Sequence, residues 1–183
     1  MKSVIRRGTT SGLALLLVVI VIAMVPTPAS AAEVLVMQVP GIPGSSKVVG
    51  HVGWITVISF AGSAVAPPTT GGAQPCQMVV QKPLDIASPH LWVATVNAQT
   101  FTTPIRIQVL AAGAGGTTYV LYDIELTNAE ITSIGDAGST GLPQESVTLK
   151  AAKVSLTFNT QNPETGVITS TTTSFTCAAG STT

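Results

Sequence analysis

The residues of this chain that could do chemistry are few and widely spaced. Two cysteines, Cys76 and Cys177, and two histidines, His51 and His90, are its only soft metal ligands. None of them stands at the C-x-x-C or H-x-x-H spacing that brings ligands together on one turn or helix. The sequence therefore predicts no metal site and no bound cofactor.

Catalytic patterns are equally scarce. No serine occupies a G-x-S-x-G elbow, and each histidine is typical of a structural or surface residue rather than a general base. Asp123 and Glu125 lie on one side of an expected strand and are interpreted as a solvated face. A carboxylate pair for glycoside hydrolysis stays open from spacing alone, but two Trp and two Tyr offer little stacking surface for sugars. We expect a protein without enzymatic activity.

The N-terminus has the three parts of a secretory signal. Basic residues precede the unbroken apolar run Leu13–Val25, and the small residues Ala29–Ala31 follow as a cleavage site. We expect cleavage after Ala31, which makes 1–31 a signal peptide and 32–183 a single domain. The apolar run is short against the ~20 residues of a membrane span, and an uncleaved membrane anchor is the alternative.

Export places both cysteines in an oxidising compartment: the periplasm, the cell surface or the medium. A pair of cysteines there is more often a disulfide than two free thiols, so we predict a bond between Cys76 and Cys177. The closed loop of about 100 residues would stabilise the fold by about 4.7 kcal/mol in the chain-entropy model. The bond would tie the last strand to the middle of the domain.

The charge balance excludes one class of partner. Three of the eight basic residues lie in the leader, so five remain against eight acidic residues, a net charge of about −3. Such a chain has no basic patch for a phosphate backbone, and we expect no nucleic acid as partner.

The elements that must position these residues are almost all strands. Period-two alternation and turn residues predict about seven strands, one short helix and two glycine-rich loops, which is typical of a small, closed or nearly closed antiparallel β-barrel. The expected strands are Glu33–Val39, Val48–Phe60, Cys76–Gln81, Thr102–Leu110, Tyr119–Thr132, 147–158 and Val167–Cys177, and the loops are Ala61–Pro75 and Gly135–Glu145. The Thr- and Ser-rich last strand must be held by backbone pairing rather than burial.

Two local features refine this picture. Ser88 followed by Pro89 predicts a helix N-terminus, with a helix to about Ala98 that packs through Leu91, Trp92 and Val96. In 147–158 the apolar residues change from odd to even positions, which predicts a β-bulge near Ala151 or Ala152.

In their order, these segments resemble the Hcp family, the haemolysin-coregulated proteins that form the tube of type VI secretion systems. The matching segments are "VPGIPGSSKVVGHVGWITVISF", "CQMVVQKPLDIASPHLWVATVNAQTF", "IRIQVLAAG", "YVLYDIELTNAEITSI" and "ESVTLKAAKVSLTF". The resemblance covers roughly Val39 to Phe175. It implies a β-barrel of two sheets with one flanking helix, hexameric rings that stack into tubes, and a lumen that carries effector proteins as cargo. The loop Ala61–Pro75 is similar to the family's extended loop, which reaches toward the neighbouring ring.

The leader departs from the family, whose tube proteins carry none. We therefore expect a structural homologue of the tube protein that assembles with itself outside the cytoplasm. The alternative is an exported monomeric β-barrel that binds a ligand or effector or acts as an adhesin.

One strand suggests where subunits meet. Val48–Phe60 is apolar on both faces, so one face can fill the barrel while the other needs cover from the helix or from a neighbouring subunit. We predict a subunit interface at Trp54, Val57 and Phe60.

Overall fold

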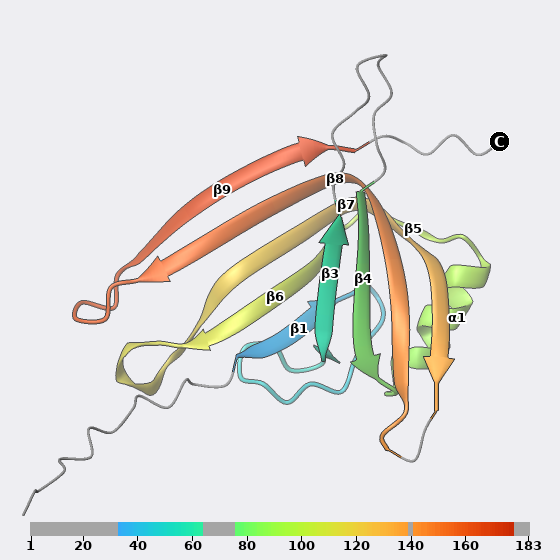
Figure 1. Ribbon diagram of the computed structural model, residues 1–183, viewed down its shortest axis with the longest axis horizontal. Coiled ribbons are helices and arrows are strands. Elements are labelled where there is room, and N and C mark those ends of the chain that lie inside the picture. Colours follow the sequence, from blue (N-terminus) through green and yellow to red (C-terminus); the bar gives the residue numbers. More distant parts are fainter. Residues whose placement is uncertain (1–32, 64–75, 139–140, 178–183) are drawn as a thin grey trace, which may run out of the picture. The chain divides into compact units, whose positions relative to one another are not determined.

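The computed structural model describes residues 33–63, 76–138 and 141–177 (Figure 1). The expected signal peptide, 1–31, and most of the expected loop Ala61–Pro75 lie outside the described residues. Within them, the chain forms nine strands, one α-helix and one 3₁₀ turn. They are β1 (Val34–Gln38), β2 (Ile55–Val57), β3 (Ser59–Ser63), β4 (Cys76–Pro83), α1 (Ser88–Val96), β5 (Thr100–Phe101), β6 (Ile105–Ala112), η1 (Ala114–Gly116), β7 (Thr118–Ala137), β8 (Gln144–Gln161) and β9 (Ile168–Thr176).

The strands belong to one antiparallel sheet that curls until its ends meet. Its order is β2-β1-β6-β7-β8-β4-β3, with β5 paired to β7 and β9 paired to β8. β2 and β3 end the sheet on opposite sides, yet only Ile58 separates them in the chain, and its N–H donates to the Gln81 carbonyl at 2.8 Å. The mainly β fold with one helix is confirmed, although the strands form one hydrogen-bonded sheet rather than two.

The strand expected over Val48–Phe60 is only partly correct. Gly50 and Gly53 have φ of +79°, a backbone conformation that interrupts a strand, and regular pairing starts at Ile55. Residues 46–54 instead form a tight loop in which the Ser46 N–H donates to the Trp54 carbonyl at 2.8 Å. A Cβ at Gly44 would collide with the backbone of the returning segment, so glycine is required at this crossing.

Strands β7 and β8 form a long hairpin (Figure 1). In β8 the buried residues are odd-numbered up to Ala151, and the next buried residue is the even-numbered Val154, a change that the sequence predicted. The predicted β-bulge near Ala151 is wrong, because the pairing keeps one register across the change, from Thr127↔Lys153 to Ala129↔Ala151. Both strands change face together at Asn128, whose φ of +48° turns the chain.

Of the three residues predicted to pack helix α1 against the sheet, only Leu91 does so. Leu91 and Ala94 are buried, whereas Trp92 is 40% and Val96 is 79% exposed. The buried positions follow from Ser88 at spacings of three residues, so the contact at the start of the helix sets its rotation.

That contact is a buried polar cluster, which we define as Lys82, Asp85, Ser88 and Glu145. The Lys82 Nζ lies 2.8 Å from the Glu145 Oε2, 2.9 Å from the Asp85 Oδ1 and 2.9 Å from the Ser88 Oγ. Lys82 and Glu145 have no exposed surface. The buried polar cluster joins β4, α1 and the first residues of β8.

Ser88 is therefore not the N-cap that the sequence predicted. The N-cap is Ala87, without a side-chain hydrogen bond, because the Ser88 hydroxyl is occupied inside the buried polar cluster. It donates to Glu145 at 3.0 Å and accepts the N–H of Asp85 at 3.1 Å.

Replacing the buried lysine should destabilise the domain strongly. Lys82→Met leaves Glu145 buried without its counter-charge, and we expect the free energy of unfolding to fall by about 3–5 kcal/mol. Urea unfolding followed by circular dichroism measures this, with Lys153→Met, at an exposed position of the same sheet, as the control near zero. The double variant Lys82→Met with Glu145→Leu should be more stable than Lys82→Met alone. Equal or lower stability of the double variant would contradict the coupling.

The turn at Asn128 should tolerate few residues. Asn128→Val forces a β-branched side chain into the left-handed region, and we expect a loss of about 1–2 kcal/mol. Asn128→Gly should be close to neutral in the same unfolding experiment, because glycine adopts this φ freely. A Val variant as stable as the Gly variant would show that the hairpin can change face without the left-handed residue.

Candidate assembly and binding surfaces

The two histidines differ in their surroundings. The His51 Nε2 lies 2.7 Å from the Gln108 Oε1, and its ring meets the Trp54 ring edge-on at 4.7 Å. His90 is exposed on the first turn of α1. No group of three His, Cys, Asp or Glu residues that could hold a metal ion occurs in the part of the chain that the structure describes.

Asp123 and Glu125 are not the free solvated face that the sequence suggested. Both meet Arg106 on the neighbouring strand β6, where the guanidinium hydrogen-bonds Asp123 and its Nε lies 3.4 Å from the Glu125 Oε1. The Asp123 hydrogen bond is the main cause that raises the pKa of Arg106 above its usual value. The three residues form a surface ion-pair network, so both carboxylates are engaged in holding β6 against β7.

The residues predicted for the subunit interface do not form one exposed patch. Val57 is 6% exposed and pairs with Leu35 in β1, so its side chain belongs to the core. Trp54 and Phe60 are half-buried. The exposed neighbour is Ile58, at the junction of β2 and β3, with 46% of its surface accessible. An interface in this region would use Ile58 rather than Val57.

The concave side of the sheet holds an apolar pocket of about 270 Å³. Strands β3, β4, β7, β8 and β9 all contribute to it. Aromatic rings at its rim come from three of these strands, and Gln77 and Ser63 are among its few polar lining residues. The lining comprises Phe60, Gly62, Ser63, Cys76, Gln77, Met78, Tyr122, Ile124, Leu126, Leu149, Val154, Leu156 and Phe175. Sequence reasoning missed this site because no local pattern brings five strands together.

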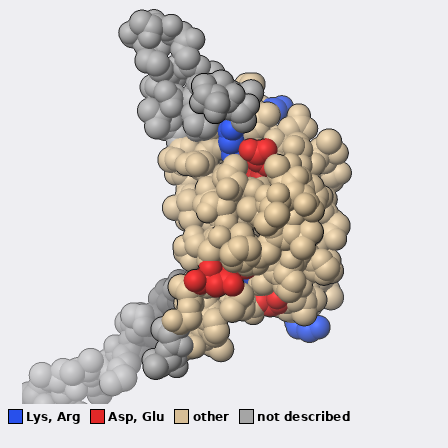
Figure 2. All heavy atoms as spheres, turned by 90° about the vertical axis from the view of Figure 1, so that its right-hand side faces the viewer, with Lys and Arg blue, Asp and Glu red and all other residues tan. Residues whose placement is uncertain are grey.

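The outward face of α1 is a second apolar surface. Trp92, Val93 and Val96 are exposed and line a shallow hollow with Asn97. Figure 2 views the domain from the side on which α1 lies in Figure 1, and charged side chains are sparse there. An apolar face of this kind on a soluble domain typically marks a contact surface.

Strand β9 is the most exposed element of the sheet. Every residue from Ile168 to Thr176 is exposed, and within the described residues β9 pairs only with β8. The expectation that this strand is held by backbone pairing rather than burial is confirmed. Its other edge has no backbone partner among residues 33–63, 76–138 and 141–177, and an edge of this kind is a template for a further strand.

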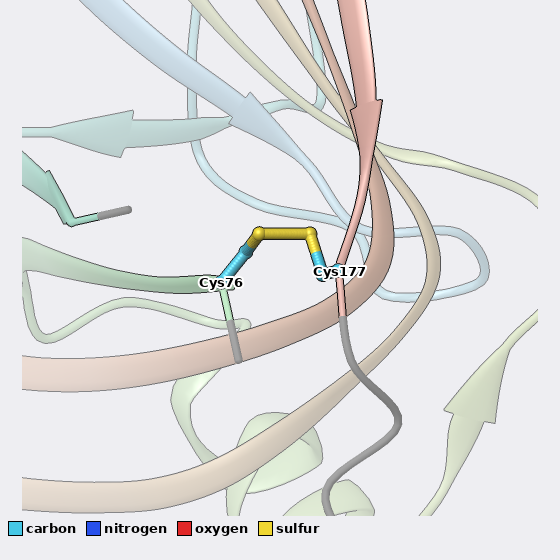
Figure 3. The surroundings of a disulfide bond; sticks show 2 residues. All are labelled: Cys76 and Cys177. Atoms are coloured by element: carbon cyan, nitrogen blue, oxygen red, sulfur yellow. A yellow bond between two sulfur atoms is a disulfide. The ribbon is translucent and has the colours of Figure 1, made fainter. Parts of the chain in front are cut away.

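The predicted disulfide is present and links the first residue of β4 to the residue that follows β9. Cys76 and Cys177 are joined with a Cα–Cα distance of 5.5 Å (Figure 3). On one edge of β8, β4 covers the residues up to Ala151 and β9 covers those from Lys153. The Cys177 N–H donates to the Ala152 carbonyl between them at 2.8 Å. The bond therefore closes the point where β4 and β9 diverge.

The only helix in residues 33–63, 76–138 and 141–177 with more than one turn is α1, and none there is long and apolar enough to cross a membrane.

Comparison with known proteins identifies relatives of the whole sheet. The family model described as "Type VI secretion system effector, Hcp" matches residues 36–158. No curated protein matches the chain.

Among solved structures, one described as a type six secretion system protein is 23% identical with a TM-score of 0.65, and the match covers 75% of this chain and 90% of that one. A type VI secretion system effector from Yersinia pestis is 17% identical with a TM-score of 0.63 over 78% of this chain and 98% of that one. Hcp1 from Salmonella typhimurium is 17% identical with a TM-score of 0.62 over 77% and 93%.

At these identities the solved structures show a shared fold. The family match, in contrast, spans the sheet from β1 through most of β8. The chain belongs to the Hcp family of type VI secretion system proteins.

Proposed function

We propose that this Hcp-family chain is an exported, non-enzymatic structural subunit that assembles with itself into hexameric rings, and that the rings stack into tubes. Its family consists of structural tube proteins, and no group of residues that could hold a metal ion occurs in the described part of the chain. The N-terminal leader and the disulfide support a site of action outside the cytoplasm. Effector proteins are the proposed cargo of the ring lumen.

The observation that carries this proposal is the open edge of β9. A nine-residue strand that is exposed throughout and paired on one side only is a hazard for a protein that works as a monomer. Its Thr and Ser side chains suit pairing with another polar strand, and they offer little apolar surface that would aggregate at random. A contact between this edge and a different edge of the next subunit is heterologous, and such contacts form a ring when the rotation between subunits closes and a helical filament when it does not.

The apolar face of α1 and Ile58 add surface that a second subunit would cover. Net charge is low, so repulsion between identical subunits is small. Purified 32–183 should run as a ring of six in size-exclusion chromatography with light scattering, and negative-stain images should show rings. A stable monomer at high micromolar concentration would contradict the proposal.

The apolar pocket favours a second candidate function. A monomeric carrier would use this cavity of about 270 Å³ for an apolar ligand. A monomer in light scattering whose intrinsic fluorescence shifts on addition of a fatty acid would support the carrier and not the ring.

Proline substitution in β9 should separate assembly from folding. The N–H groups of consecutive strand residues point to opposite edges, so of Thr171→Pro and Thr172→Pro one removes a bond to β8 and the other removes a donor on the free edge. We expect the variant that lacks the free-edge N–H to keep its unfolding midpoint within a few degrees of the unmodified chain and to stay monomeric. Thr171→Val and Thr172→Val, which retain the N–H, are the controls. If both proline variants assemble like the unmodified chain, the β9 edge is not the contact.

Substitutions at two neighbouring residues, Val57 and Ile58, test which part of the β2–β3 junction is core and which is subunit interface. Val57→Asp places a charge in the core and should lower the free energy of unfolding by more than about 3 kcal/mol. Ile58→Asp should leave thermal unfolding nearly unchanged but weaken assembly, because a charge would be buried between subunits. Thermal melts and light scattering on both variants give the comparison. Normal assembly of Ile58→Asp would exclude this junction from the interface.

A further inference from the structure

Strand β9 owes its position to few interactions. Its ladder with β8 runs from Lys153↔Thr176 to Gln161↔Ile168, and its side chains add only surface hydrogen bonds, such as that between Thr157 and Thr172 at 2.9 Å. No residue of β9 is buried, and apart from Phe175, which lines the apolar pocket, none of its residues lines that pocket or belongs to the core. Terminal strands of this kind open locally at low free-energy cost.

The disulfide attaches the weak end of this strand to a strong element. Cys76 begins β4, whose Met78, Val80 and Lys82 are buried in the core or the buried polar cluster. Cys177 follows directly after β9, and the two cysteines are separated by 101 residues of chain. The other end of β9 is already held by a tight turn, in which the Gly166 N–H donates to the Asn162 carbonyl at 2.8 Å. The bond thus completes the fixation of β9 at both ends.

Because of its position, the disulfide is expected to affect β9 and its free edge more than the rest of the sheet. It lies where β4 and β9 separate along β8 (Figure 3). Phe175 and Cys76 both line the apolar pocket, so the same bond holds one wall of that pocket. The strand pairing of β1, β2, β4, β6 and β7 and the contacts of the buried polar cluster do not involve the bond.

We propose that the Cys76–Cys177 disulfide is a redox switch that makes the edge of β9 competent for assembly, so that subunits join only in an oxidising compartment. Formation of the bond transfers two electrons to a thiol–disulfide oxidant and releases two protons. A dithiol reductant supplies two electrons and two protons and restores the two thiols, and β9 then frays from Cys177 inward. A frayed strand pairs poorly with a neighbouring subunit, because ordering it adds to the free-energy cost of association.

This inference rests on the proposed function. A comparison of three samples distinguishes a failure of the redox switch from a failure of ring assembly itself. The samples are 32–183 with the disulfide, the same protein treated with dithiothreitol, and the variant Cys76→Ser with Cys177→Ser. The chain has only two cysteines, so the reductant acts on this bond alone and should not alter the double variant. Light scattering over a concentration series measures assembly in each sample.

We expect the disulfide form to assemble. For the reduced form and the double variant, the protein concentration at half-assembly should be higher by a factor of about ten or more. Reoxidation should restore assembly. Hydrogen exchange monitored by mass spectrometry should show faster exchange in 168–176 of the reduced protein, with exchange in β7 unchanged. An apolar dye that fluoresces on binding should brighten as Phe175 leaves the pocket.

Three outcomes overturn the switch. Equal assembly of all three samples would show that the disulfide does not control the edge, while the ring proposal would stand. Faster exchange in every strand after reduction would show that the bond supports the whole fold rather than β9. A disulfide form that stays monomeric would overturn both the ring proposal and the switch that depends on it.

Discussion

The change of face in the β7–β8 hairpin is the constraint on which the rest of this domain depends. The hairpin's two strands are twenty and eighteen residues long, and the buried residues of both halves belong to one core cluster. At Asn128 both strands switch their inward residues, so each half can turn its apolar side chains toward that same core. One half pairs with β4, while the other pairs with β6 and β9. The disulfide lies close to the boundary between these halves, where the Cys177 N–H donates to the Ala152 carbonyl, and the apolar pocket is lined by residues of both halves.

The buried polar cluster holds β4, the start of α1 and the first residues of β8 together. Lys82 and Glu145 lie in strands that pair with each other, and Ser88 brings the start of the helix to the same point. Taking charges out of water is expensive, so the cluster stabilises this arrangement only because each partner is held at hydrogen-bond distance. It therefore selects one rotation of α1, with Leu91 inward and Trp92 outward, and this choice leaves the apolar face of the helix exposed.

These features fit the proposal that the exposed surfaces of the domain are contacts between subunits. Three ionisable residues that the sequence singled out have partners in the fold. His51 contacts Gln108, and Asp123 and Glu125 both pair with Arg106. Unpaired backbone on β9 and apolar side chains on α1 are what the single chain leaves uncovered. A structural role in the Hcp family follows from this distribution, because assembly is the process that covers such surfaces.

The sequence by itself determined the elements whose signals are local. Alternation identified β6, β7 and β8, the Thr- and Ser-rich composition identified β9 as a strand without burial, and the shift from odd to even apolar positions located the change of face. The disulfide was predicted from the number of cysteines and from the expected export of the chain. These inferences succeeded because strand period, turn residues and the chemistry of a compartment act on neighbouring residues or on composition.

Only the tertiary structure decided which surfaces are covered. Val57 is core and Ile58 is exposed because β2 and β3 pair with opposite ends of the sheet, which no pattern within 48–60 encodes. Leu91 faces inward because Ser88 is bound by Lys82 and Glu145, residues six positions before it and fifty-seven after it. Register, helix rotation and the pocket depend on contacts between distant segments, and the free energy of those contacts outweighs local preference.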